Sequence, residues 1–109
     1  MNSKKPANNK RATLPRASDR TNQFVKDWVG LNESGRFDMP RLKLLMTALI
    51  NNDGPLDAEW LDHELKGAWK DHRECHVHGD FLLIYRLDGK GKNEQVIFVR
   101  TGTHAALFE

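Results

Sequence analysis

The 109-residue chain lacks the features that define several large protein classes. Cys75 is its only cysteine, which excludes an intrachain disulfide and a cysteine-rich zinc module and fits a reducing compartment. No apolar run approaches the roughly 20 residues needed to span a bilayer. The first 18 residues contain no apolar stretch of the kind found in a secretory signal. A glycine-rich phosphate loop and a Gly-x-Ser-x-Gly nucleophile motif are also absent. We therefore expect a single small cytoplasmic domain without a membrane segment.

Charge is distributed unevenly along the chain, although the formal net charge is only +2. Residues 1–20 hold six basic side chains and one acid, whereas 11 basic and 14 acidic side chains follow, a net charge of −3. Residues 1–10 have almost nothing apolar to bury, so we predict a disordered basic arm there and one domain over residues 11–109. Such an arm could meet nucleic acid or an acidic partner, or serve only as a solvated tail.

Two amphipathic helices are predicted in the first half, and they form a helical hairpin. The first follows Ser18 or Asp19 as its N-cap, and the second has Asp38 as its N-cap and Pro40 in its first turn. Apolar residues recur at three- and four-residue spacing in both: Phe24, Val25, Trp28 and Leu31 within residues 19–32, and Leu42, Leu45, Met46, Leu49 and Ile50 within residues 39–52.

The second half changes to segments typical of strands. Residues 68–77, 81–89 and 94–102 are rich in β-branched and aromatic side chains and are bounded by Gly or Asp. The short turn at residues 88–91 predicts that the last two strands form an antiparallel hairpin. Together these elements indicate an α+β fold in which the helical hairpin covers one side of a small antiparallel sheet.

Two short elements are predicted at the ends of this domain. Thr13 and Leu14 could form a strand, which Pro15 would confine to an edge because proline cannot donate to a sheet ladder. At the other end Thr103 could cap a final helical turn, which the apolar residues 107 and 108 would pin to the sheet by burial.

All five histidines follow residue 62, which is an uneven distribution. If a regular strand runs through residues 72–78, then His72, His76 and His78 share one face with Glu74, while the alternate residues, Arg73, Cys75 and Val77, point the other way. General acid–base catalysis is one use for such a face, because imidazoles exchange protons at neutral pH. Zinc bound by His76 and His78 is a second, although this spacing matches no recognised structural zinc pattern. The third possibility is that these histidines lie on the surface and have no functional role.

A cation and several aromatic rings complete the candidates. Arg100, near the end of the last strand, is the best placed phosphate-binding group, and an ion pair with a surface acid is its alternative. Trp69, Phe81 and Tyr85 could stack on RNA bases or fill the core.

Two segments resemble one known family. HELKGAWKDHRECHVHGDFLLIYRL (residues 63–87) and FVRTGTHAALF (residues 98–108) resemble the YafQ-type branch of the RelE-like bacterial toxins, ribosome-dependent mRNA interferases of type II toxin-antitoxin systems. The similarity covers about residues 19–108. It implies a RelE-like fold and an endoribonuclease without metal or cofactor. In that reaction an RNA 2'-hydroxyl attacks the adjacent phosphate and leaves a 2',3'-cyclic phosphate and a 5'-hydroxyl.

The resemblance also implies roles for individual residues. The family's catalytic positions are His63, His76, Asp80, His104 and Phe108, with Arg100 as a phosphate contact. We expect Phe81 and Trp69 to bind the substrate as well. We expect His76 and His104 to transfer protons and His63 to position the substrate. Phe81 stands where some relatives have tryptophan.

The partners that the resemblance implies are a DinJ- or RelB-like antitoxin, the ribosome with its mRNA, and operator DNA bound only by the toxin-antitoxin complex. The acidic body predicts weak binding to free RNA, because nucleic-acid affinity comes largely from cations. The alternative is a catalytically weak regulatory protein of the same fold that acts through antitoxin binding and operon corepression.

Overall fold

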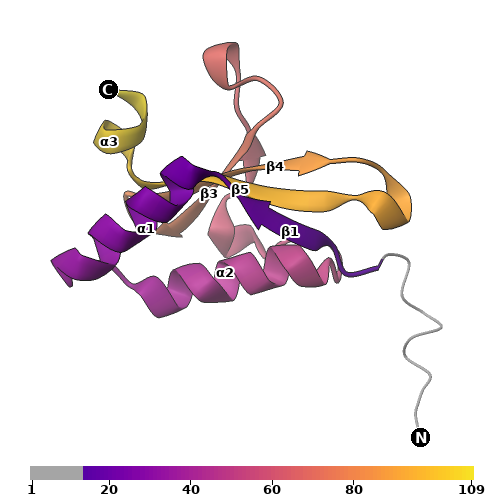
Figure 1. Cartoon of the computed structure of the whole chain (residues 1–109), viewed down its shortest axis with the longest axis horizontal. Helices are drawn as coiled ribbons and strands as arrows, with labels where there is room; N and C mark the ends of the chain where they lie inside the picture. Colours follow the sequence, from indigo (N-terminus) through magenta and orange to yellow (C-terminus); the bar gives the residue numbers. More distant parts are fainter. Residues whose placement is uncertain (1–13) are drawn as a thin grey trace, which may run out of the picture.

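The computed structural model describes residues 14–109, so the predicted basic arm and Thr13 lie outside the described residues. Five strands form one sheet in the order β1-β5-β4-β3-β2 (Figure 1). Neighbouring strands are antiparallel except β1 and β5, which are parallel. The elements are β1 (Ala17–Arg20), α1 (Asn22–Ser34), α2 (Met39–Asn51), β2 (His63–Glu64), β3 (Arg73–His78), β4 (Phe81–Asp88), β5 (Gln95–Thr103) and α3 (His104–Phe108), with short 3-10 helices at Ala58–Trp60, Gly67–Trp69 and Gly91–Asn93. The predicted α+β fold is confirmed.

The two long helices begin at side-chain caps. Asp38 accepts a hydrogen bond from the Arg41 N–H at 3.0 Å, which confirms the predicted start of α2. Thr21 caps α1 instead of Ser18 or Asp19, and its Oγ1 accepts from the Phe24 N–H at 3.0 Å. The predicted cap was wrong because Ser18 and Asp19 belong to β1, whose pairing with β5 keeps the backbone extended as far as residue 20.

The strands differ from the prediction at three places. The edge strand exists, but it spans Ala17–Arg20, and Leu14 lies outside it. β3 begins at Arg73, because residues 67–69 form a 3-10 turn instead of the predicted strand. β2 was not predicted at all, since two residues carry no periodicity. No helix within residues 14–109 has the length and apolar character needed to cross a membrane.

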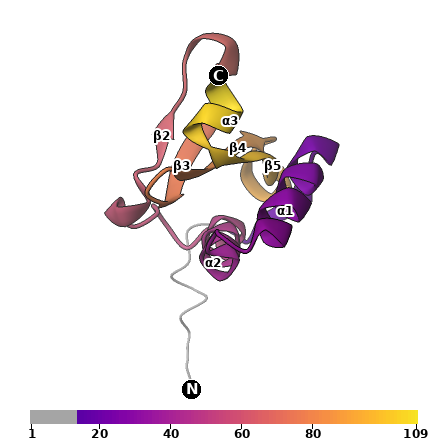
Figure 2. The same cartoon turned by 90° about the vertical axis from the view of Figure 1, so that its left-hand side faces the viewer.

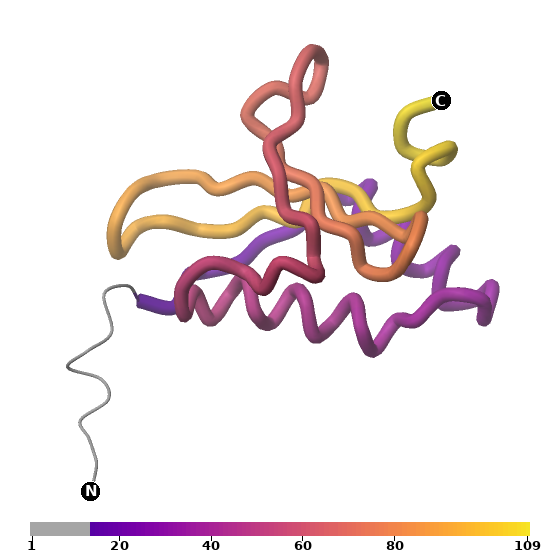
Figure 3. The backbone as a smooth tube through the Cα atoms, turned by 180° about the vertical axis from the view of Figure 1, so that it is seen from behind, coloured from indigo at the N-terminus to yellow at the C-terminus, as the bar shows by residue number. Residues whose placement is uncertain are grey.

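The sheet has one face covered by long helices and one face that is largely open (Figure 2). Phe24 of α1 and the apolar stripe of α2 pack on the first face, against Cys75, Val77 and Leu83 among others. On the second face a smaller cluster joins Leu82 and Ile84 to Leu107, which confirms that burial pins α3 to the sheet. The connection between β2 and β3 stands away from the sheet on the same side as α3 (Figures 1 and 3). The candidate site lies on this second face.

Candidate active site

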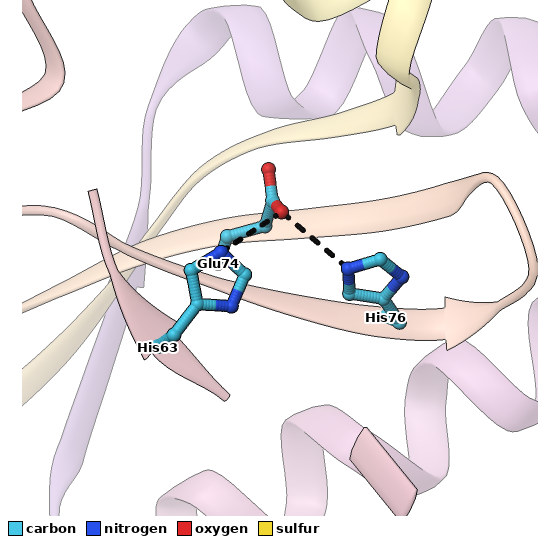
Figure 4. Close-up of side chains that lie close together, drawn as sticks. All are labelled: His63, Glu74 and His76. Carbon is cyan, nitrogen blue, oxygen red and sulfur yellow. Dashed lines mark ion pairs between the residues drawn. The ribbon is translucent and has the colours of Figure 1, made fainter. Parts of the chain in front are cut away.

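Two histidines from neighbouring strands converge on one buried carboxylate (Figure 4). Glu74 Oε1 lies 3.3 Å from His63 Nε2 and 3.5 Å from His76 Nε2. The Glu74 side chain is only 8 % exposed, against 48 % for His63 and 32 % for His76. Strand alternation brings Glu74 and His76 to the same face, as predicted, and the β2–β3 register sets His63 opposite Glu74. We call these three residues the histidine–glutamate cluster.

Hydrogen bonds at the other ring nitrogens orient both imidazoles. His63 Nδ1 lies 2.7 Å from the Leu61 carbonyl oxygen, and His76 Nδ1 lies 3.3 Å from the Gly79 carbonyl oxygen. A carbonyl oxygen only accepts hydrogen bonds, so each Nδ1 is assigned as the donor. Nε2 is then the position that gains or loses a proton, and both Nε2 atoms face Glu74 Oε1. The cluster therefore brings two imidazole nitrogens close to one carboxylate oxygen.

A second carboxylate anchors the short strand that carries His63. Asp62 accepts three hydrogen bonds from Arg73, with Nε–Oδ1 at 3.3 Å, Nε–Oδ2 at 3.2 Å and Nη2–Oδ2 at 3.0 Å. Its Oδ1 also accepts from the Tyr85 hydroxyl at 2.7 Å and from the Cys75 thiol at 3.4 Å. We call Asp62 and these three donors the Asp62 anchor. Because neighbouring residues of an extended chain face opposite ways, Asp62 makes its contacts on the helix-covered side, while the His63 side chain lies on the open side.

The side chains that donate to Asp62 stay protonated. Burial, together with Asp62, raises the pKa of the Cys75 thiol and of the Tyr85 hydroxyl well above their ordinary values. The hydrogen bond to Asp62 raises the pKa of Arg73 in turn. Cys75 is therefore a neutral core residue that offers neither a nucleophile nor a metal ligand.

The other half of the site is the short helix α3. Thr103 Oγ1 accepts from the Ala106 N–H at 3.2 Å, which confirms the predicted cap. Asp80, in the β3–β4 turn, accepts from the His104 N–H at 3.1 Å. The His104 side chain is 60 % exposed, and within residues 14–109 it makes no hydrogen bond or ion pair to the histidine–glutamate cluster. Asp80 thus holds the start of α3 beside the turn that follows His76.

Aromatic rings link α3 to the β2–β3 connection. The His104 and Phe108 ring centroids lie 4.9 Å apart, and Phe108 lies 5.9 Å from Trp69 in an edge-to-face arrangement. Trp69 meets the His72 ring edge-to-face at 5.3 Å. His72, which sequence analysis placed on the same face as His76, lies one residue before β3, and its carbonyl oxygen accepts a hydrogen bond from the Leu65 N–H at 2.9 Å.

The third expected member of the histidine face, His78, is turned away by a β-bulge. The β3–β4 register pairs His76 with Leu82 and His78 with Phe81, so the residue between the two histidines has no paired residue in β4. His78 therefore lies with Phe81 on the helix-covered side, where both line a small cavity with Phe37. Zinc bound by His76 and His78 was one of three possibilities for this face, and the structure does not support it, since it groups His76 with His63 and Glu74 instead.

Two predicted substrate contacts have partners within the protein. Arg100 forms a double hydrogen bond with Asp27 of α1, with Nε–Oδ2 at 2.8 Å and Nη2–Oδ1 at 3.1 Å, which raises the pKa of Arg100. Asp27 also accepts the Thr101 N–H at 3.1 Å and so ties α1 to β5. Phe81 is 4 % exposed, and its ring packs edge-on against Phe37 at 5.0 Å. It therefore presents no free face to a base.

Among residues 14–109, the histidine–glutamate cluster is the group of side chains whose ligand atoms could hold a metal ion. One ligand atom from each of the three residues lies within 4.8 Å of the others. Two imidazole nitrogens and one carboxylate oxygen suit zinc and related divalent transition metals.

Sequence analysis gave no role to two carboxylates that shape the site. Glu74 was correctly placed on the same face as His76 by strand alternation, but it was not included among the candidate site residues. Asp62 gave no signal, since its partners come from two other strands and belong to the opposite face of the sheet.

Comparison with known proteins agrees with this architecture. Residues 16–109 match the family model described as the bacterial toxin of a type II toxin-antitoxin system, YafQ. The mRNA interferase toxin YafQ of Escherichia coli K12 is 47% identical over 95 residues, which cover 87% of this chain and 98% of that protein. The toxin chain of the E. coli DinJ-YafQ toxin-antitoxin complex superposes with a TM-score of 0.75 at 47% identity, covering 88% of this chain and 100% of that chain. A metal-bound toxin from Helicobacter pylori superposes with a TM-score of 0.71 at 32% identity, covering 85% of this chain and 99% of that chain.

Proposed function

The chain belongs to the YafQ family of bacterial toxins of type II toxin-antitoxin systems, and we propose that it cleaves mRNA on the ribosome by metal-independent acid–base catalysis. It is an mRNA interferase and therefore an endoribonuclease, since the E. coli relative at 47% identity is one. The observation that carries the proposed chemistry is the convergence of His63 Nε2 and His76 Nε2 on a single buried oxygen of Glu74.

The proposed reaction needs one base and one acid. His76 Nε2 takes the proton of the RNA 2'-hydroxyl as that oxygen bonds to the adjacent phosphorus. His104 gives a proton to the departing 5'-oxygen, which leaves a 2',3'-cyclic phosphate and a 5'-hydroxyl. Glu74 stabilises the imidazolium that forms on His76, because an opposite charge at 3.5 Å favours the protonated ring. His63, held at both ring nitrogens, positions the substrate beside His76.

The remaining contacts hold the RNA and its cleavage machinery in place. Arg100 Nη1, which Asp27 does not engage, is the proposed phosphate contact. Trp69 and Phe108 are the aromatic rings that we assign to base stacking, since Phe81 is buried. Asp80 acts by holding the His104 backbone through the hydrogen bond at 3.1 Å.

We further propose three partners and a compartment. The E. coli relative has been solved in complex with the antitoxin DinJ, and a DinJ- or RelB-like antitoxin is the proposed partner of this chain. The toxin-antitoxin complex would then bind operator DNA. Ribosomes would present the mRNA to the toxin, so the net acidic domain would not need a high affinity of its own for RNA. Cleavage would take place in the cytoplasm.

Expression of the wild type and of His104→Ala in a bacterium, with mRNA 5' ends mapped, tests this proposal. We expect growth arrest with new 5'-hydroxyl ends from the wild type only. Equal arrest by a folded His104→Ala protein would contradict the role of His104. A folded, antitoxin-free wild type that gives neither arrest nor new ends would favour the regulatory alternative, a protein that acts through antitoxin binding and corepression.

A second function is favoured by the ligand geometry of the histidine–glutamate cluster and by the metal-bound H. pylori relative. We propose that a divalent transition metal binds there and inhibits cleavage, because coordination would occupy both Nε2 atoms. Titration calorimetry with Zn²⁺ tests this. We expect one ion per chain, binding at least about tenfold weaker to Glu74→Gln. Equal affinity of the two proteins would contradict the assignment.

A further inference from the structure

The β-bulge in β3 places His78 beside a cavity on the far side of the β3–β4 turn. It moves His78 out of the catalytic face and next to Phe81 on the helix-covered side. There His78 helps to line a cavity of about 200 Å³, together with the connection between α1 and α2. Figure 3 shows this turn between α3 on one side and the α1–α2 connection on the other.

The cavity combines aromatic rings with basic groups. Phe37 is half-buried and lies against Phe81, and the Arg36 guanidinium lies 5.5 Å from the Phe37 ring centroid. His78 is exposed at the rim. Across the part of the chain that the structure describes, neither Arg36 nor His78 is in an ion pair. Both basic groups are therefore available to a ligand.

The two acids of the cavity are already engaged. Asp38 accepts the Arg41 N–H at the start of α2, and Asp80 accepts the His104 N–H at the start of α3. Each carboxylate is thereby partly compensated by a backbone dipole. These two carboxylates therefore repel a bound anion less strongly than two carboxylates without hydrogen-bond donors would.

The cavity adjoins the catalytic residues directly. Thr103 and Asp80 line it, and these are the residues that cap α3 and hold His104. His78 is two residues beyond His76 in the same strand. Gly79 lies between the cavity and the catalytic face, and nothing stands within 4 Å of where its side chain would be. An extended RNA strand that continues from the face of His76 across the β3–β4 turn would reach Arg36 and His78 next.

We propose that this Arg36–His78 cavity binds a nucleotide of the single-stranded RNA that flanks the scissile phosphate. Arg36 contacts its phosphate, and the base lies against Phe37 with its edge toward His78. A cation beside an aromatic ring is the combination with which proteins bind unpaired nucleotides. The proposal rests on the proposed function, because it assigns a further contact to the same RNA.

The test compares Arg36→Ala and His78→Ala with the wild type in two assays. One assay measures kcat and KM for ribosome-bound mRNA. The other measures binding of a short RNA with a 2'-O-methyl group at the scissile nucleotide, which blocks attack, by fluorescence anisotropy. We expect KM and the dissociation constant of the RNA to rise about tenfold in each variant, with kcat within about twofold of wild type. Lys92→Ala, which removes one charge at the distant β4–β5 connection, should leave both unchanged.

The outcomes separate this inference from the proposed function. If the wild type cleaves and both variants keep its KM and its RNA affinity, the cavity is not an RNA site and the inference fails. If the wild type does not cleave, the proposed function fails, and the binding assay alone decides the cavity. A loss of antitoxin binding by the variants with RNA binding unchanged would also overturn the inference. Arg36 and His78 are exposed, so both variants should melt as the wild type does.

Discussion

The two halves of the candidate site are built by different means. The strand half consists of side chains from paired strands around the buried Glu74, with His63 fixed at both ring nitrogens. The helix half is a single five-residue helix, whose His104 side chain is 60 % exposed and whose backbone is held by Asp80. Buried side chains fix the strand half. The helix half is held by the Asp80 contact, by the Thr103 cap and by the burial of Leu107, and it leaves the His104 side chain exposed. Substitutions confined to one half should therefore show what that half contributes to cleavage.

Breaking the strand half should have the largest effect. Glu74→Gln removes the charge that stabilises the His76 imidazolium, and we expect a roughly thousandfold fall in the cleavage rate of ribosome-bound mRNA. Single-turnover kinetics measures this. Glu64→Gln is the matched control, because Glu64 adjoins His63 but its side chain is 79 % exposed. A folded Glu74→Gln protein with the wild-type rate would contradict the assigned role.

Changing the helix half should reveal whether Asp80 positions His104 or transfers protons. Asp80→Ala removes the acceptor of the His104 N–H, and we expect a roughly hundredfold loss of rate. Asp80→Asn keeps an acceptor oxygen and should lose only about threefold. The same kinetics measures both. If the two variants are equally inactive, Asp80 exchanges protons and the positioning role is wrong.

Removing the support beneath the strand half should affect stability as well as cleavage. Asp62→Ala leaves the buried Tyr85 hydroxyl and the Arg73 guanidinium without their acceptor, so the free energy of unfolding should fall by about 2 kcal/mol. Urea denaturation measures the change. Asp57→Ala should cost less than about 0.5 kcal/mol, because Asp57 makes no side-chain cap bond. A smaller loss for Asp62→Ala than for Asp57→Ala would show that the Asp62 anchor contributes little.

The smallest expected effect is the pH dependence of stability that comes from Cys75, which lies on the helix-covered face of the sheet. The raised pKa of Cys75 means that the native thiol binds its proton more tightly than the unfolded one. Its contribution to stability is complete below the ordinary thiol pKa and declines as the pH rises above it. Unfolding curves at pH 7 and pH 10 should show this decline, and iodoacetamide should label native Cys75 far more slowly than the unfolded chain. Rapid labelling of the native protein at pH 7 would contradict a neutral, buried thiol.

Local patterns were enough to predict the helices and the long strands. The apolar stripes of α1 and α2, the Asp38 cap and the β4–β5 hairpin all depend on residues close together in the chain. The errors concern contacts between distant segments. Ser18 and Asp19 were assigned to a helix cap because nothing nearby shows that they pair with β5.

The candidate site was predictable to a similar extent. Alternation correctly placed His76 with Glu74, and the resemblance supplied His63 and His104. The bulge that turns His78 away has no sequence signature, because it depends on how β3 and β4 align. Asp27 as the partner of Arg100 could not be identified among the many acids of the chain, since 73 residues separate the two.

The parallel pairing of β1 with β5 separates the two ends of the described chain. Ala17 pairs with Gln95, at the start of β5, whereas α3 follows the end of β5 (Figure 1). An affinity tag or a surface linker attached before residue 14 would therefore join the molecule remote from His104. One attached at Glu109 would follow Phe108 directly. Immobilisation for binding measurements should use the N-terminal side, which leaves the surface proposed to bind RNA open.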